Sequence, residues 1–171
     1  MVFGWLRSRG GPGAAATVRA VPALPLQTGQ RVLVQVDGTP GGGHGQAGLG
    51  VIVRDEQGRV LVWRCSQAAA MTCNEAEYQA LLLGLRLVAA TYPGLPVRVL
   101  TDSRLVAEQM TRRRAGRSEP LRALHAEAVA VCEGMGAVEF VHVPRTVNRL
   151  ADALAWEALA GTGLLLRKGL R

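Results

Sequence analysis

The spacing of apolar residues divides the chain into a hairpin-rich first half and a second half in which strands and helices alternate. Three apolar runs, RVLVQVDG (31–38), GLGVIVRD (48–55) and RVLVWRCS (59–66), are joined by the glycine-rich turn TPGGGHGQAG and by the short turn 55–58. Alternating runs separated by such turns are typical of antiparallel hairpins. The sequence therefore predicts three consecutive antiparallel strands.

The second half predicts helices that pack against this sheet. Thr72 and Glu75 have the spacing of a capping box, and Gly84 is the only glycine in the apolar stretch 73–90 that follows. Glycine inside a helix costs roughly 1 kcal/mol relative to alanine, so we expect Gly84 to allow close packing on the sheet. Further strands are predicted over 97–101 and 138–143, and further helices over 103–110, 118–133 and 147–160. This order predicts an α/β fold with a mixed sheet flanked by helices.

The charge of the chain favours a polyanionic partner. The chain contains twenty Lys and Arg residues and thirteen Asp and Glu residues, which gives a net charge of +7. This balance makes nucleic acid the first candidate and an acidic membrane surface the second. No apolar run reaches the roughly 18 residues of a membrane span, and no convincing export signal is present. We therefore expect a cytoplasmic protein without a membrane partner, and a monomer by default.

The ends of the chain differ in composition from its centre. Residues 1–29 contain no acidic side chain and are rich in Gly, Ala and Pro, which predicts a flexible basic extension. We expect one catalytic domain over 30–161 and a basic tail over 162–171. The three cysteines are odd in number and lack zinc-site spacing, so they are expected to be reduced core thiols: Cys65, Cys73 and Cys132.

Four acidic residues lie where a soluble fold gains little from a charge. Asp37 and Asp102 each end an apolar strand, Glu77 lies in the first long helix, and Asp152 lies at the start of the last helix. Taken singly, each has a structural explanation, as a turn residue, a helix N-cap, a surface residue or a first-turn acid. Asp55, in a polar hairpin turn, is expected to be only a turn residue. Carboxylates gathered at one place repel each other unless cations lie between them, and hard divalent ions such as Mg²⁺ are the natural choice.

The blocks that carry these acids resemble the signature blocks of type 1 ribonuclease H. The matching segments are VDGTPGGG, TCNEAEYQALLLGL, LTDS and VNRLADALA, within about 31–160. The resemblance implies a ribonuclease H-like fold with a five-stranded mixed sheet, three antiparallel strands followed by parallel ones. Its first and fourth strands would be neighbours, which brings Asp37 and Asp102 together. It also implies that Glu77 and Asp152 point to the same spot, so that all four acids are catalytic metal ligands.

The resemblance also implies a chemistry. Two Mg²⁺ ions, with Mn²⁺ as a substitute, would activate a water and stabilise the leaving 3′ oxygen during phosphodiester hydrolysis. The chain resembles the subgroup that lacks the basic handle and the histidine on the loop before the last helix. Arg145 is expected in that loop as a catalytic residue that contacts the scissile phosphate or competes with a metal, and His142 is the rival for this role.

A second set of residues is predicted to contact the substrate. The resemblance and the positive charge together indicate Gly38, Gly43, Asn74, Ser103, Arg104, Arg112, Arg113, Arg114 and Asn148. Asn74 and Ser103 also have capping explanations, and the arginines could simply be solvated. Trp63 and Trp156 are expected to be packing residues.

The leading hypothesis is an endoribonuclease that cuts the RNA strand of RNA–DNA hybrids and leaves 5′-phosphate and 3′-hydroxyl ends. Three alternatives stay open: a metal-dependent nuclease acting on DNA junctions, one acting on double-stranded RNA, and an inactive nucleic-acid-binding module. The 2′-hydroxyl is the group that would distinguish RNA from DNA.

Overall fold

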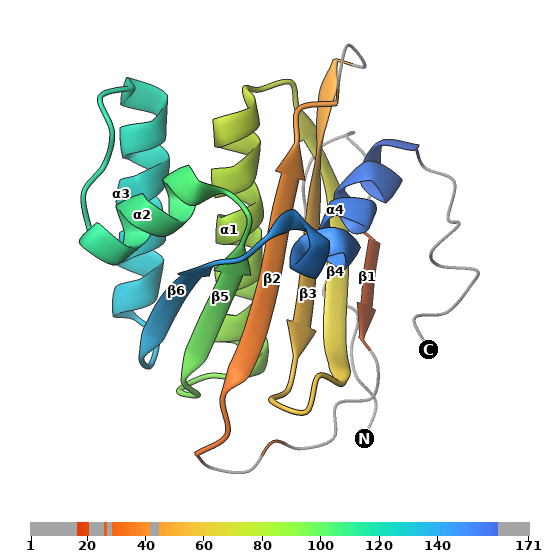
Figure 1. Cartoon of the computed structure of the whole chain (residues 1–171), viewed down its shortest axis with the longest axis vertical. Coiled ribbons are helices and arrows are strands. Elements are labelled where there is room, and N and C mark those ends of the chain that lie inside the picture. Colours follow the sequence, from red (N-terminus) through yellow and green to blue (C-terminus); the bar gives the residue numbers. More distant parts are fainter. Residues whose placement is uncertain (1–16, 21–25, 27–28, 42–44, 161–171) are drawn as a thin grey trace.

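The computed structural model describes residues 17–20, 26, 29–41 and 45–160. Its sheet has the strand order β1-β4-β3-β2-β5-β6 (Figure 1). The strands are β1 (Thr17–Ala20), β2 (Val32–Thr39), β3 (Gln46–Arg54), β4 (Val60–Ala69), β5 (Val97–Thr101) and β6 (Val138–His142). The helices are α1 (Cys73–Thr91), α2 (Arg104–Arg112), α3 (Glu119–Glu133) and α4 (Arg145–Ala160).

The five predicted strands are present as β2 to β6, and their directions agree with the prediction. β2, β3 and β4 are antiparallel neighbours, whereas β2 pairs with β5, and β5 with β6, in parallel. The turn between β3 and β4 closes as expected, because Gly58 has a positive φ of 81° and Asp55 accepts a hydrogen bond from the Arg59 amide. The first and fourth strands of the predicted five are therefore adjacent.

A sixth strand lies at the edge of the sheet. β1 pairs antiparallel with β4, with Thr17 opposite Cys65 and Ala20 opposite Val62. For these four residues the pairing corrects the expectation that 1–29 lies outside the domain. The short run TVRA has a strand pattern too brief to stand out between glycine- and proline-rich flanks. Residues 1–16 and 161–171 lie outside the described residues, so the domain boundaries stay a prediction.

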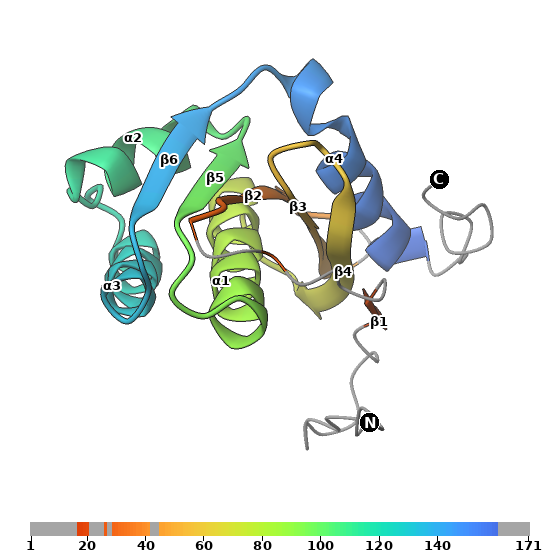
Figure 2. The ribbon, with the colours of Figure 1, turned by 90° about the horizontal axis from the view of Figure 1, so that it is seen from below.

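Helices cover both faces of the sheet. α1 packs on one face beside α3, and α4 packs on the other face against β3 and β2 (Figure 2). The larger core lies between α1 and the sheet, and a smaller cluster of Ile52, Trp63, Cys65 and Leu154 lies under α4. None of the helices within the described residues is long and apolar enough to cross a lipid bilayer.

Glycines set how closely these helices approach the sheet. A Cβ on Gly84 would lie 2.8 Å from a methyl group of Val36, so α1 packs against β2 as predicted. A Cβ on Gly50 of β3 would lie 2.1 Å from the backbone oxygen of Ala151 in α4. Both faces of the sheet therefore accept a helix backbone at short range.

Helix α4 begins earlier than the sequence pattern predicts. Arg145 is its first residue, and the Val147 amide donates to the carbonyl oxygen of Pro144 at 2.9 Å. The fixed φ of proline suits the start of a helix. The predicted loop position of Arg145 is therefore wrong, and Asp152 lies in the interior of α4 rather than in its first turn.

Candidate active site

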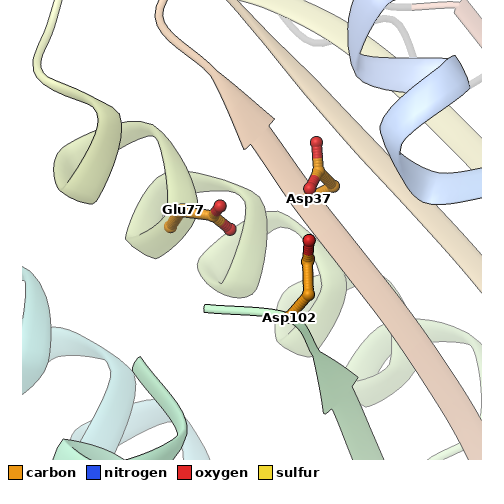
Figure 3. Close-up of side chains that lie close together, drawn as sticks. All are labelled: Asp37, Glu77 and Asp102. Carbon is orange, nitrogen blue, oxygen red and sulfur yellow. The ribbon is translucent and has the colours of Figure 1, made fainter. Parts of the chain in front are cut away.

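Three of the four predicted acids converge at one end of the sheet. β2 and β5 are paired in parallel up to Gln35 and Leu100, and Asp37 and Asp102 each lie two residues further along their chains. Glu77 reaches the same point from α1, and one carboxylate oxygen from each of the three lies within 4.8 Å of the others (Figure 3). The parallel pairing explains the convergence, because it brings the carboxyl ends of both strands to one edge.

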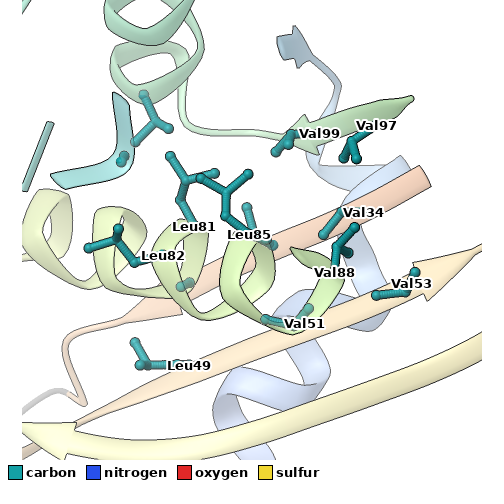
Figure 4. Packing of buried hydrophobic residues seen from close by; sticks show 14 of the residues in the cluster. Val34, Leu49, Val51, Val53, Leu81, Leu82, Leu85, Val88, Val97 and Val99 are labelled. Atoms are coloured by element: carbon teal, nitrogen blue, oxygen red, sulfur yellow. The ribbon is translucent and has the colours of Figure 1, made fainter. Parts of the chain in front are cut away.

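The core of the protein holds α1, and with it Glu77, at this edge. Leu81, Leu85 and Val88 of α1 face valines of β2, β3 and β5 (Figure 4). The capping box predicted at the helix start is present: the Glu75 amide donates to Thr72, and the Glu75 carboxylate accepts from the Thr72 amide. The Glu75 carboxylate is therefore used in the cap, as the capping-box spacing predicted, and Glu77 is the acid that reaches Asp37 and Asp102.

Gly38 brings the first turn of α1 close to β2. A Cβ at this position would lie 2.2 Å from the backbone carbon and oxygen of Ala76, so only glycine fits. The Gly38 amide also hydrogen-bonds the Glu77 carboxylate. Gly38 is buried under α1, so the structure explains this glycine by helix packing, and its contact with substrate stays a prediction.

Burial and mutual repulsion raise the pKa of two of the acids. Asp37 is 6% exposed and Glu77 is 9% exposed. Burial, then the charges of Asp102 and Asp152 and a hydrogen bond with Asp102, raise the pKa of Asp37 to about 7, against a smaller opposing effect of Arg145. Burial, then the charges of Asp37 and Asp102, raise the pKa of Glu77 to about 9. At neutral pH Glu77 therefore holds a proton and Asp37 is partly protonated, and a bound cation would replace these protons.

The chemistry of these donors fits a divalent cation. The Oε2 atom of Glu77 is buried and has no hydrogen-bond partner among the residues that the structure describes. A buried carboxylate oxygen without a partner costs free energy that a bound ion would offset. Three carboxylates without a histidine or cysteine ligand match the hard, oxygen-binding character of Mg²⁺ or Mn²⁺.

Asp152 stands beside this cluster, bound to an arginine. Its Oδ1 atom accepts a hydrogen bond of 3.0 Å from Nη2 of Arg145, whose side chain is 74% exposed. Asp152 contributes to the raised pKa of Asp37, which shows that its charge acts on the cluster. The structure thus brings three predicted ligands together and pairs the fourth with the predicted catalytic arginine.

Asn148 is completely buried, so it cannot contact a substrate as predicted. Its Nδ2 donates to the Val36 carbonyl oxygen at 2.8 Å and to Oδ1 of Asp102 at 2.7 Å. Sequence reasoning missed this role. A signal was available: Asn148 shares the spacing of Ala151 and Ala155, the buried face of α4.

The remaining predicted contacts are partly or fully exposed where the structure describes them. Asn74 is exposed in the first turn of α1, and Ser103 caps α2 by accepting from the Val106 amide. Arg104 forms an exposed ion pair with Glu108 at 3.5 Å. Arg112, Arg113 and Arg114 are exposed at the end of α2, and Gly43 lies outside the described residues. These positions stay predictions.

The structure also places His142, the tryptophans and the cysteines, and it corrects the expectations for Trp156 and Cys73. His142 is exposed at the end of β6, in register with Thr101, the residue before Asp102. Trp63 is buried as expected, whereas Trp156 is 47% exposed on α4. The cysteines are free thiols, and Cys65 is buried, but Cys73 is exposed at the start of α1 and so is not a core thiol.

Comparisons with known proteins point to one family. The family model described as reverse transcriptase-like matches residues 35–158. Ribonuclease HI of Halobacterium salinarum is 33% identical over 131 residues, covering 77% of this chain and 65% of that protein. The bifunctional protein Rv2228c of Mycobacterium tuberculosis is 33% identical over 130 residues, covering 75% of this chain but only 35% of its own length. The chain thus spans about a third of that longer relative.

Solved structures agree with these matches. The crystal structure of RNase H1 from Halobacterium salinarum superposes with a TM-score of 0.72 at 31% identity, covering 77% of this chain and 99% of the other. LC11-RNase H1, solved in complex with an RNA/DNA hybrid, superposes with a TM-score of 0.71 at 29% identity, covering 76% and 97%. The segment that the family model matches, residues 35–158, includes all four acids.

Proposed function

Because this chain belongs to the type 1 ribonuclease H family, we propose that it is a metal-dependent endonuclease that hydrolyses the RNA strand of RNA–DNA hybrids. One observation carries the proposal: carboxylate oxygens of Asp37, Glu77 and Asp102 lie within 4.8 Å of one another. The hybrid as substrate is supported by LC11-RNase H1, a relative of similar fold solved with an RNA/DNA hybrid.

The acids would hold the metal ions. Asp37, Glu77 and Asp102 form the first binding site, and Asp152 would join them once its oxygen leaves Arg145. Two bound Mg²⁺ ions would supply a nucleophilic water and charge stabilisation for the leaving 3′ oxygen, giving 5′-phosphate and 3′-hydroxyl ends. No side chain is then required as general base, which agrees with a cluster that contains no histidine.

The neighbouring residues would bind and orient the nucleic acid. Arg145 stays protonated, so it can neutralise a phosphate but cannot accept a proton. Asn74 and Ser103 lie near Glu77 and Asp102 in sequence and can donate or accept hydrogen bonds with sugars and bases. Arg112 to Arg114 would contact phosphates of the strand that is not cut.

The decisive experiment compares substrates with one preparation of protein. A labelled RNA–DNA hybrid, duplex DNA, duplex RNA and the single strands are each incubated with Mg²⁺, with Mn²⁺ or with chelator. We expect metal-dependent cleavage of the RNA in the hybrid, with 3′-hydroxyl ends. The Glu77→Gln protein, purified in parallel, reports any contaminating nuclease. Equal cleavage of duplex DNA or duplex RNA would assign a different substrate, and tight binding without cleavage would indicate an inactive module.

A further inference from the structure

The amide of Asn148 connects the Asp102 carboxylate to the backbone of β2 through two short hydrogen bonds. One N–H group donates to Oδ1 of Asp102 at 2.7 Å, and the other donates to the carbonyl oxygen of Val36 at 2.8 Å. Val36 precedes Asp37 on β2. A single side chain from α4 therefore fixes the Asp102 carboxylate relative to the strand that carries Asp37.

The surroundings leave this amide only one orientation. Both neighbours are acceptors, so a flipped amide would place its oxygen against the Val36 oxygen and the Asp102 carboxylate. The observed orientation uses both N–H donors and leaves Oδ1 buried without a hydrogen-bond partner among the described residues. Burying an acceptor without a partner is unfavourable, so this side chain is better explained by what its two N–H groups bind than by a gain in fold stability.

We propose that Asn148 is the positioning residue of the acidic cluster, which holds the carboxylate of Asp102 in place for metal binding. The inference rests on the proposed function, because it concerns the same metal site. The donated hydrogen bond keeps Asp102 from turning away from Asp37 and Glu77, which repel it once all three carboxylates are ionised. Residues behind metal ligands often change metal affinity by about 10- to 100-fold when they are replaced.

Gln35 offers a matched control on the same pair of elements. Its Nε2 donates to the carbonyl oxygen of Val147 at 2.7 Å, so it also links β2 to the first turns of α4. It is 5% exposed, and its other hydrogen bond is to Arg54 rather than to an acid of the cluster. Replacing Gln35 therefore weakens the same junction without removing a hydrogen bond from Asp102.

The test measures Mg²⁺ binding by calorimetry in the absence of nucleic acid. Leucine is nearly the size of asparagine but has no hydrogen-bond donor. We therefore expect the Asn148→Leu protein to bind Mg²⁺ at least about 10-fold more weakly than wild type. In urea unfolding, Gln35→Ala should lose about as much stability as Asn148→Leu does. Its Mg²⁺ affinity should stay within about twofold of wild type. If both variants lose affinity equally, or if Asn148→Leu keeps wild-type affinity, the proposal is overturned.

A measurement on the wild-type protein keeps the proposal testable if Asn148→Leu fails to fold. The side-chain NH₂ signals of Asn148 in a ¹⁵N-labelled sample should shift on Mg²⁺ addition, whereas those of Gln35 should not. Unchanged Asn148 signals at saturating Mg²⁺ would refute the positioning role. A wild-type protein that binds Mg²⁺ but cuts no hybrid would refute the proposed function and leave this test valid, and one that binds no Mg²⁺ overturns both.

Discussion

Nη2 of Arg145 lies 3.0 Å from Oδ1 of Asp152, two turns further along α4. The guanidinium is thus paired with a carboxylate that, under the proposed function, binds a metal ion. Its positive charge also lowers the pKa of Asp37 and of Glu77. Arg145 is therefore a permanent positive charge beside the acidic cluster. Its presence should weaken metal binding while it assists the binding of phosphate.

Replacement of Arg145 by alanine should separate these two effects. We expect Mg²⁺ to bind Arg145→Ala more tightly, by roughly fivefold at most, because water screens the charge of an exposed side chain. Hybrid cleavage should slow at saturating Mg²⁺, because the phosphate loses its partner. Calorimetry at pH 9 and single-turnover cleavage measure the two quantities. Arg86→Ala, which breaks an exposed ion pair with Glu127 on α3, is the control and should change neither.

The raised pKa values predict how stability depends on pH. Asp37 and Glu77 bind protons more tightly in the folded protein than in the unfolded chain. The stability contributed by protonated Asp37 is complete below pH 3.8 and is lost as the pH rises to about 7. For Glu77 the corresponding values are pH 4.5 and about 9. Without metal, the free energy of unfolding should fall across this range by on the order of a few kcal/mol. Added Mg²⁺ should restore stability most strongly above pH 7.

Urea unfolding at several pH values, with Mg²⁺ or with chelator, checks this expectation. The Asp37→Asn and Glu77→Gln double variant is the control, and its stability should vary less with pH and respond little to Mg²⁺. A metal-free wild-type protein whose stability rises from pH 5 to pH 9 would contradict the assignment of these two acids as proton-binding groups.

Asp102→Asn should abolish hybrid cleavage and leave the fold intact. The asparagine oxygen can still accept the hydrogen bond from Asn148, but the loss of charge weakens metal binding, and we expect a rate reduction of roughly a thousandfold. Asp55→Asn is the matched buried control. Asp55 is 1% exposed and binds Arg59 in a turn, so its replacement should reduce stability and preserve cleavage. Full activity of Asp102→Asn would remove Asp102 from the site.

The strands, helices and caps were largely predictable because they depend on local patterns. The spacing of Thr72 and Glu75 predicted the N-terminal cap of α1, and Gly84 predicted the close packing of α1 on the sheet. The adjacency of Asp37 and Asp102 depends on the parallel pairing of strands about 65 residues apart along the chain. No local pattern encodes this pairing, and it was predicted from the family resemblance. Asn148 was misassigned for a related reason, since its two partners lie on β2 and at the end of β5.

Gly38→Ala should test the packing role assigned to Gly38. The added Cβ would lie 2.2 Å from backbone atoms of Ala76, and the helix backbone cannot move without displacing the α1 core. We expect a stability loss of about 1–3 kcal/mol, measured by urea unfolding, and weaker Mg²⁺ binding because Glu77 shifts. Gly134→Ala is the control: its Cβ would meet only the Val131 oxygen at 3.6 Å, so stability should change little. Equal stability of both variants would contradict the close approach of α1 to β2.

The arginines after α2 should determine the salt dependence of hybrid binding. Arg112, Arg113 and Arg114 are exposed, and each phosphate contact contributes about 0.9 to the slope of log affinity against log salt concentration for a duplex. Replacing all three by alanine should therefore lower the slope by up to about 3 and weaken binding at low salt. Arg31 and Arg98 pair with Glu139 at the opposite end of the parallel strands, so their double alanine variant should keep the wild-type slope. If the triple variant binds with an unchanged slope, these arginines are solvated side chains, and the uncut strand must be held elsewhere.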